Sequence, residues 1–125
     1  MKKLEYSPDA IQKIQEIEYI VRVRYGDKVA GKVKKTIVQR IQSLKMNEKL
    51  GVSMKDLYGV TPDYRKLYVA HNHVFYLLEE DKIRIVKIYN EKEDYMYKLF
   101  GIRSVDDESD GFWDEIEKQK GLQEE

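Results

Sequence analysis

Both histidines of the chain, His71 and His73, lie at the break between two apolar runs, and His73 begins the second of these runs. Histidine is the side chain whose ordinary pKa lies closest to neutral pH, so it can accept and donate protons under physiological conditions. A second polar segment follows the last apolar run and contains Lys92 and Tyr97. These side chains can also exchange protons with a substrate, or bind an anion. If the chain carries out chemistry, we expect it at these two segments.

The histidines belong to residues 63–100, whose composition predicts a three-stranded antiparallel meander. Its apolar runs are rich in Val, Ile, Tyr and Phe, which suit a pleated and half-buried surface. The breaks between the runs, at His71-Asn72 and residues 80–82, are short enough only for hairpin turns. The three runs cover residues 65–70, 73–79 and 83–90.

A strand and two helices are predicted before the meander. Residues 2–6 alternate between apolar and charged side chains, which indicates a strand. Ser7 is expected to cap a helix that ends at Gly26, with Pro8 at its first position. Asp27 is expected to cap a second helix, which would run antiparallel to the first. The predicted apolar stripes are Ile11, Ile14, Ile17, Val21 and Tyr25, then Ala30, Val33, Ile37, Ile41 and Leu44.

The remaining segments predict loops, a brief strand and two short helices. We expect a loop at residues 46–55 and brief pairing at residues 57–60. A short helix that ends at Gly101 follows the meander. A last helix, capped by Ser104 or Ser109, would place Phe112, Trp113 and Ile116 on one side. The order predicts a two-layer α+β fold with an N-terminal strand, a helical hairpin, the antiparallel meander and short C-terminal helices.

The neutral net charge of the chain conceals an uneven distribution. Residues 106–125 carry a net charge of −7, whereas residues 1–105 carry +7. We therefore divide the chain into a basic domain, residues 1–103, and an acidic amphipathic tail, residues 104–125. The basic domain suggests an anionic partner such as nucleic acid, although the two charges could simply offset each other. The tail could fold back onto the basic domain or contact a partner.

Composition also excludes several kinds of protein. The chain contains no cysteine, so it forms neither disulfides nor thiolate metal sites. No apolar run approaches the roughly 20 residues that span a bilayer. These features predict a soluble, cytoplasmic protein with no membrane partner, no metal and no cofactor.

The sequence of features resembles the RelE/ParE superfamily of bacterial type II toxins, which belong to toxin–antitoxin and plasmid stabilisation systems. The segments that carry the resemblance are LEYSPDA, YRKLYV, HVFYLLEEDKIRIVKI and YNEKEDYMYKLF, within residues 3–102. The resemblance implies a cognate antitoxin that wraps and neutralises the toxin. RelE-like members cut messenger RNA in the ribosome, whereas ParE-like members inhibit DNA gyrase and are not nucleases. The fold alone does not choose between them.

Similarity to the RelE-like nucleases implies roles for individual residues. Arg65, Lys66 and Lys92 are expected to hold phosphate, and His73 and Tyr97 to transfer protons, so His73, Arg65, Lys92 and Tyr97 form the candidate catalytic set. His73 stands where these nucleases usually show an arginine, which favours the gyrase alternative. Further contacts to nucleic acid are expected from His71, Lys34, Lys35 and Arg40.

Our first hypothesis is a metal-independent, ribosome-dependent endoribonuclease that inhibits translation, with messenger RNA and the ribosome as partners besides the antitoxin. The alternatives are a ParE-like toxin that inhibits DNA gyrase, and a relative that has lost toxicity. The residues also have plain structural readings. The histidines could flank a surface turn, the lysines could lie on a solvated helix face, and one of Tyr95 and Tyr97 could pack on the core.

Overall fold

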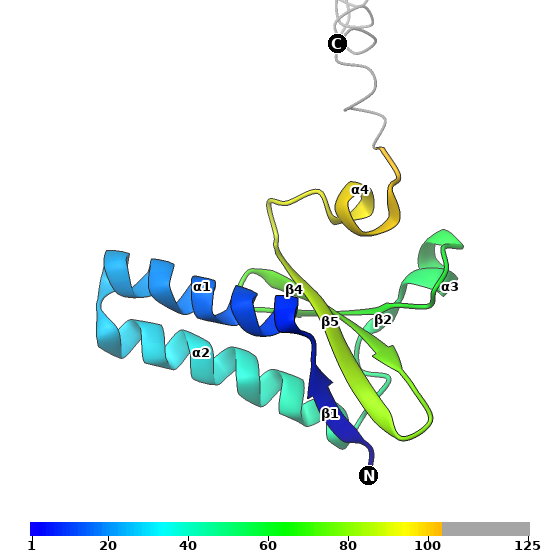
Figure 1. Cartoon of the computed structure of the whole chain (residues 1–125), viewed down its shortest axis with the longest axis horizontal. Coiled ribbons are helices and arrows are strands. Elements are labelled where there is room, and N and C mark those ends of the chain that lie inside the picture. The colour runs from blue at the N-terminus through cyan, green and yellow to red at the C-terminus, as the bar shows by residue number, and fades with distance from the viewer. Residues whose placement is uncertain (104–125) are drawn as a thin grey trace, which may run out of the picture. The chain divides into compact units, whose positions relative to one another are not determined.

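The computed structural model describes residues 1–103, which belong to two units, residues 1–93 and a unit that begins at Asp94. In the first unit a helical hairpin lies on one face of a five-stranded sheet (Figure 1). The predicted last helix and the acidic tail, residues 104–125, lie outside the described residues. The elements are β1 (Lys3–Tyr6), α1 (Pro8–Tyr25), α2 (Asp27–Gln42), η1 (Ser43–Lys45), β2 (Val52–Ser53), α3 (Met54–Tyr58), β3 (Arg65–Val69), β4 (Asn72–Leu78), β5 (Lys82–Asn90) and α4 (Tyr95–Phe100).

The sheet has the strand order β1-β5-β4-β3-β2. Strands β3, β4 and β5 form the predicted antiparallel meander. The N-terminal strand β1 pairs with the edge of the meander, in parallel with β5. The two-residue strand β2 completes the other edge, antiparallel to β3. The expected α+β architecture is therefore confirmed.

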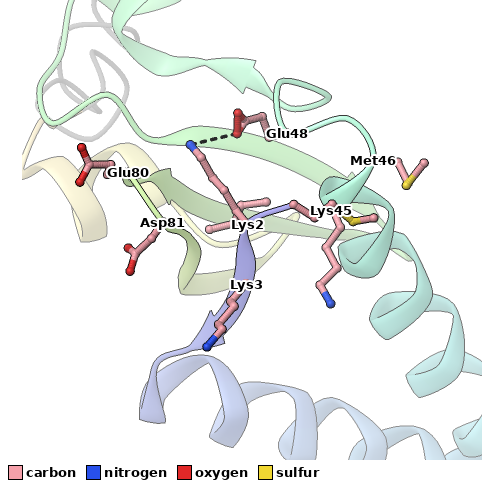
Figure 2. A pocket seen from close by; sticks show the side chains of 9 residues that line it. Lys2, Lys3, Lys45, Met46, Glu48, Glu80 and Asp81 are labelled. Carbon is pink, nitrogen blue, oxygen red and sulfur yellow. Dashed lines mark ion pairs between the residues drawn. The ribbon is translucent and has the colours of Figure 1, made fainter.

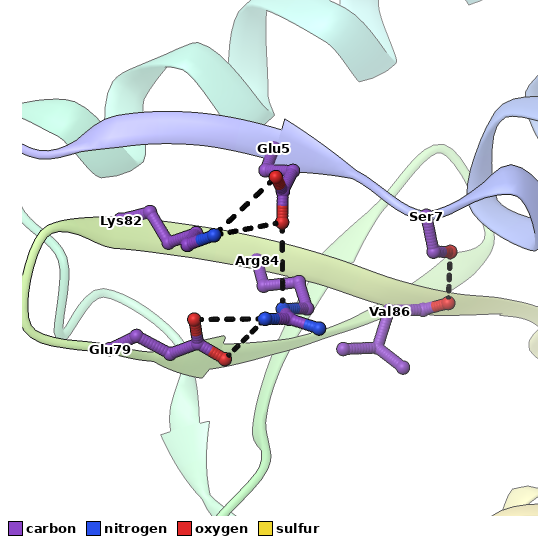
Figure 3. A network of polar contacts seen from close by, with 6 residues as sticks. All are labelled: Glu5, Ser7, Glu79, Lys82, Arg84 and Val86. Carbon is purple, nitrogen blue, oxygen red and sulfur yellow. Dashed lines mark hydrogen bonds and ion pairs between the residues drawn. The ribbon is translucent and has the colours of Figure 1, made fainter.

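Ser7 joins β1, α1 and β5. Its side-chain oxygen accepts a hydrogen bond from the N–H of Ala10 at 3.0 Å, which is the predicted N-cap. The same hydroxyl donates to the carbonyl of Val86 at 2.6 Å (Figure 3). The Ser7 N–H donates to the carbonyl of Ile85 at 2.9 Å. One small residue thus ends the strand, starts the helix and attaches both to β5.

Charged side chains cross the β1–β5 pair beside this junction (Figure 3). Glu5 lies 3.4 Å from the Nζ of Lys82 and 3.7 Å from the Nε of Arg84. Arg84 also pairs with Glu79 at 3.0 Å. Ion pairs this exposed typically contribute less than about 1 kcal/mol each, so they align the strands more than they stabilise the fold.

The core lies between the helical hairpin and the sheet. Its buried residues are Ala10, Ile14, Ile37, Ile41 and Leu44 from the helical layer, and Leu67, Val69, Val74, Tyr76, Ile83, Ile85 and Ile88 from the sheet. The predicted stripe of α2 is confirmed, with Val33 only partly buried. The predicted stripe of α1 is partly wrong, because Ile11 is 46% exposed and Tyr25 is 66% exposed, and Ala10 joins the core instead. Ala10 and Ile14 are four residues apart and share a face, whereas Ile11 lies one residue off it.

The start of α2 differs from the prediction. Gly26 is the cap, with φ of 94°, and no side chain caps this helix. Asp27 is the first helical residue, and it accepts a hydrogen bond from the Nε of Arg22 at 2.9 Å. The connection is therefore one residue long, and a glycine makes it possible because the left-handed φ would strain other residues.

The segment after α2 is more regular than predicted. The expected loop at residues 46–55 contains β2 and the start of α3. The expected brief strand at residues 57–60 is wrong, since Leu57 and Tyr58 end α3. The Ser53 hydroxyl accepts from the N–H of Asp56 at 3.0 Å and so begins this short helix.

The first turn of the meander lies one residue earlier than predicted. Its two central residues are Ala70 and His71, and Asn72 already belongs to β4. Both central residues have positive φ, 50° and 64°, as a two-residue type I′ hairpin requires. Asn72 supports the turn, because its side-chain amide donates to the carbonyl of Ala70 at 2.7 Å.

No helix within residues 1–103 combines the length and the apolar character that a membrane span needs.

Candidate functional site

Three side chains meet at the β3–β4 hairpin, and we call them the hairpin cluster: Tyr68, His71 and Glu91. The Tyr68 hydroxyl donates to the Oε1 of Glu91 at 2.6 Å. The Nδ1 of His71 lies 3.1 Å from the Oε2 of the same carboxylate and 3.3 Å from the Tyr68 oxygen. One carboxylate therefore holds both a phenol and an imidazole, and the second ring nitrogen of His71 is left outside this contact.

Residues far apart in sequence form the hairpin cluster because the turn and the end of β5 are joined through the backbone. The N–H of Glu91 donates to the carbonyl of His71 at 2.8 Å. Tyr68 reaches the same place from β3, three residues before His71. A non-glycine residue with φ of 64° costs of order 1 kcal/mol or more, so the surrounding contacts must hold His71 in place.

The charges of the hairpin cluster reinforce these contacts. Hydrogen bonds from Tyr68 and then His71 lower the pKa of Glu91, so its carboxylate stays ionised. The hydrogen bond to Glu91 raises the pKa of Tyr68, so the phenol stays protonated. An ionised carboxylate that fixes one imidazole nitrogen is a common way to orient a histidine for proton transfer or binding.

His73 lies beside the hairpin cluster on the sheet face opposite the helices, which we call the outer face. It pairs in register with Tyr68 of β3 and Tyr89 of β5, and its ring centre is 5.3 Å from that of Tyr68. Desolvation lowers the pKa of His73, and the positive charge of Lys66 lowers it further. The imidazole is thus predominantly neutral at pH 7, which suits a base better than an acid.

Arg65 lies at the other end of β3. Its Nε donates to the carbonyl of Gly51 at 3.0 Å, and its Nη2 donates to the carbonyl of Lys49 at 3.2 Å. It pairs in register with Tyr76, a core residue, so it points to the helical side of the sheet. Its guanidinium holds the loop before β2.

Lys66 and Lys92 have different surroundings. Lys66 shares the outer face with His73, because side chains alternate along β3 and Leu67 and Val69 face the core. Lys92 lies in the turn after β5, where its backbone N–H donates to the side chain of Asn90 at 3.0 Å.

Tyr97 belongs to α4 in the second unit. Its ring carries the guanidinium of Arg103 at 5.6 Å from the ring centre, a cation–π contact. Tyr97 is exposed, whereas Tyr95 is partly buried. Lys92 belongs to the first unit, and the predicted pairing of Tyr97 with Lys92 stays a prediction.

The predicted basic residues of α2 do not join the histidines. α2 lies in the helical layer, on the opposite side of the sheet from the outer face. Lys34 lies 3.6 Å from the Oε1 of Glu18 on α1, whereas Lys35 and Arg40 are exposed. The predicted nucleic-acid contacts thus fall on two faces of the first unit.

Tyr68 and Glu91 were absent from the sequence-based site. The alternation of β3 contained the signal for Tyr68, because period two places it on the same face as Lys66 and opposite His73. Glu91 had no comparable signal. The position of its side chain depends on the length of the β3–β4 turn and on the residue at which β5 ends, and the sequence did not predict these boundaries to within one residue.

A pocket lies near the N-terminus of the first unit, away from the hairpin cluster (Figure 2). Its volume is about 630 Å³. Lysines and acidic residues line it together, and Lys2 pairs with Glu48 at 3.0 Å. These charges largely neutralise one another, so the hollow has no clear preference for an anion or a cation. Within residues 1–103, no group of three or more His, Asp or Glu side chains is arranged to hold a metal ion.

The comparisons with known proteins define the class of this chain. Residues 4–95 match the family described as the ParE toxin of the type II toxin–antitoxin system parDE. The chain therefore belongs to the ParE toxin family, within the RelE/ParE superfamily, and a cognate antitoxin is its partner. The predicted superfamily is confirmed.

A solved structure supports the fold. The chain is similar to the chromosomal ParDE toxin–antitoxin system from P. aeruginosa, with a TM-score of 0.62 and 21% sequence identity. The match covers 72% of this chain and 96% of that one. No curated protein sequence matches the chain.

Proposed function

We propose that the protein is a ParE-like toxin that inhibits DNA gyrase by binding it, without cutting nucleic acid. The support begins with membership of the ParE family, because ParE-like members of the superfamily act in this way. The observation that carries the proposal is the position of Arg65. Arg65 is the arginine expected to stabilise phosphate in a nuclease, yet its guanidinium donates hydrogen bonds to the carbonyls of Gly51 and Lys49.

Metal-independent RNA cleavage needs three groups close to one phosphate: a base, a cation and an acid. Arg65 is three residues from Tyr68, about 10 Å along the strand, and it points to the opposite face of the sheet. It cannot share a phosphate with His73 without leaving its present contacts. His73 also has a lowered pKa, which weakens it as an acid.

The RelE-like nuclease remains the second candidate because of one observation, the hairpin cluster. Glu91 orients His71, and His73 lies next to Tyr68, so an exposed imidazole and a half-buried one flank the same phenol. With Lys66 on the same face, this arrangement offers proton transfer and one positive charge. In that case His71 and His73 would carry the reaction, and Arg65 would not.

Expression of the full chain without an antitoxin separates these functions. A gyrase inhibitor should induce the DNA-damage response and stop replication while messenger RNA stays intact. The double variant His71→Ala/His73→Ala should remain toxic, because the histidines have no catalytic role. Loss of translation with codon-positioned cuts, abolished by the double variant, would refute the proposal and support the nuclease. No growth arrest by the wild type would leave a relative that has lost toxicity.

A further inference from the structure

The positive charge of the first unit is concentrated in one segment. Residues 1–93 contain 19 Lys and Arg side chains and 13 Asp and Glu side chains. Residues 28–45 contribute six of these bases and none of the acids, so the rest of the unit holds 13 of each and is neutral. The whole excess of positive charge therefore belongs to α2 and η1. The six bases are Lys28, Lys32, Lys34, Lys35, Arg40 and Lys45.

Three of these lysines lie in a row on the solvent side of α2, and we call Lys28, Lys32 and Lys35 the basic stripe. An α-helix turns about 100° per residue, which places all three within about 40° of the direction opposite to the buried Ile37. All three side chains are exposed, as is Gln39, which continues the row. At 1.5 Å per residue the basic stripe is about 10 Å long. It is a straight line of positive charge on a rigid element.

The solvent side of α1 has a different charge pattern, although both helices belong to the same hairpin (Figure 1). On α1, acids and bases pair with each other. Lys13 lies 3.6 Å from Glu16, and Arg22 lies 3.2 Å from Glu18. Lys34 of α2 pairs with the same Glu18 across the hairpin at 3.6 Å. Among the described residues, by contrast, the basic stripe forms no ion pair.

The basic stripe lowers the stability of its own helix. Side chains three or four residues apart are neighbours on a helix, and like charges at this spacing repel each other. Lys28 also lies in the first turn of α2, where the positive end of the helix dipole disfavours a cation. A face that only has to be solvated can interleave acids with bases, as α1 does. A row of unneutralised lysines therefore points to a polyanion that supplies the missing negative charge.

The surroundings of the basic stripe indicate which polyanion it fits. Proteins that hold single-stranded nucleic acid stack the bases on aromatic rings. Residues 26–57 contain no aromatic residue, so α2 offers no such platform. A rigid row of lysines instead fits the phosphate backbone of a duplex, which carries about one negative charge per 1.7 Å of its axis. Contacts to phosphate position a protein on the duplex without reading its sequence.

We propose that the basic stripe binds the phosphate backbone of double-stranded DNA, so that the toxin contacts the DNA that gyrase holds as well as the enzyme. The choice of DNA over duplex RNA rests on the proposed action on gyrase, because gyrase acts on double-stranded DNA. The charge argument does not depend on that target. The basic stripe lies on the helical layer and the hairpin cluster on the outer face of the sheet, so DNA on the stripe leaves the cluster uncovered.

Fluorescence anisotropy of the full chain with a short labelled DNA duplex tests the basic stripe. The variant Lys28→Gln/Lys32→Gln/Lys35→Gln should bind at least about 10-fold more weakly than the wild type at low salt. The slope of log K against log salt concentration should also become shallower by about 2–3, because each lost phosphate contact removes about 0.9. The variant should melt at or above the wild-type temperature, since it loses repulsion between like charges.

Two further variants control for net charge and for the lysine positions. The variant Lys3→Gln/Lys49→Gln/Lys55→Gln removes the same charge from exposed side chains outside α2. It should weaken DNA binding by less than about threefold, because it leaves the basic stripe intact. Replacement of the three stripe lysines by arginine keeps the charge and should leave binding within about twofold of the wild type. Equal losses in the two glutamine variants, or an unchanged salt slope, would refute the phosphate site.

The identity of the partner is decided by the same material. No binding of the wild type to DNA at low salt would overturn the proposal and indicate an acidic protein surface instead. Binding to duplex RNA more than about 10-fold tighter than to DNA would overturn the choice of DNA.

A supercoiling assay keeps the DNA site and the gyrase target apart. The glutamine variant of the basic stripe should need at least about 10-fold more toxin than the matched control to inhibit gyrase. Equal inhibition by the two variants would refute contact with the DNA that gyrase holds. A wild type that binds DNA through the basic stripe but does not inhibit gyrase would refute the target and leave the DNA site standing.

Discussion

At the scale of single residues, Tyr76 combines a buried ring with two hydrogen bonds of its hydroxyl to a neighbouring loop. It is fully buried, and its hydroxyl accepts from the N–H of Gly51 and donates to the carbonyl of Glu48, each at 2.8 Å. A Cβ at Gly51 would lie 2.8 Å from the Tyr76 ring, so only glycine fits there. The phenol thus fixes the loop that also accepts the hydrogen bonds of Arg65.

Tyr76→Phe should therefore destabilise the protein. The variant leaves the Gly51 N–H buried without its partner, which typically costs about 1–3 kcal/mol. Urea denaturation followed by circular dichroism measures the loss. Tyr19→Phe is the control, because Tyr19 is exposed, and it should change the free energy of unfolding by less than about 0.5 kcal/mol. Equal effects of the two substitutions would contradict the role of the buried hydroxyl.

His73 should make stability depend on pH. Its pKa is lowered from 6.5 in the folded chain, mainly by desolvation, so the unfolded chain takes up a proton first as the pH falls. This contribution is present above pH 6.5 and is lost as the pH falls through the folded pKa. An NMR titration should place the His73 midpoint below 6.5, and His73→Gln should remove part of the stability loss between pH 7 and 5. A midpoint at or above 6.5 would contradict this assignment.

At the scale of elements, the helical hairpin depends on one glycine. Gly26 has φ of 94° and caps α2, while Gly31 lies inside α2 with open space around it. Gly26→Ala should destabilise the protein by about 1–2 kcal/mol, because alanine is strained at that φ. Gly31→Ala should stabilise it by about 0.5–1 kcal/mol, because alanine favours a helix. Thermal melts of both variants check the opposite signs, and a shared sign would argue against the backbone cause.

The sequence predicted the elements well where a local signal was strong. Ser7-Pro8 defined the start of α1, and the two period-3.6 stripes defined a hairpin. Prediction failed where packing decides, as at Ile11, which lies beside the buried face. It also failed at α3, whose start depends on the Ser53 cap. The direction of the β1 pairing was not predicted, because no local pattern reports that β1 runs parallel to β5.

The sequence predicted which segments form the candidate site, but not the contacts that their side chains make. The β3–β4 turn was recognised from the histidines, yet the shift of one residue placed His71 in the turn and brought it to Glu91. Arg65 was assigned to phosphate from resemblance alone. Its contacts with two loop carbonyls arise from the return of residues 49–51 beside β3, a long-range arrangement that the sequence could not report.

At the scale of the whole molecule, the first unit separates two surfaces. The sheet's outer face carries Lys66, His73 and the hairpin cluster. An apolar groove of about 320 Å³ lies between the β3–β4 turn and side chains of α1 and α2 such as Ile20 and Val29. They meet at the β3–β4 turn, where His71 belongs to both. A partner that covers the turn could therefore act on both surfaces at once. The predicted division at residue 103 and the role of the acidic tail remain predictions.

The central claim is that the toxin acts on gyrase and not on messenger RNA. The direct test mixes the purified full chain with DNA gyrase and relaxed plasmid and, in parallel, with translating ribosomes. We expect loss of supercoiling at toxin concentrations that leave ribosome-bound messenger RNA intact. Messenger RNA cut at codon-positioned sites, together with unchanged supercoiling, would contradict the claim.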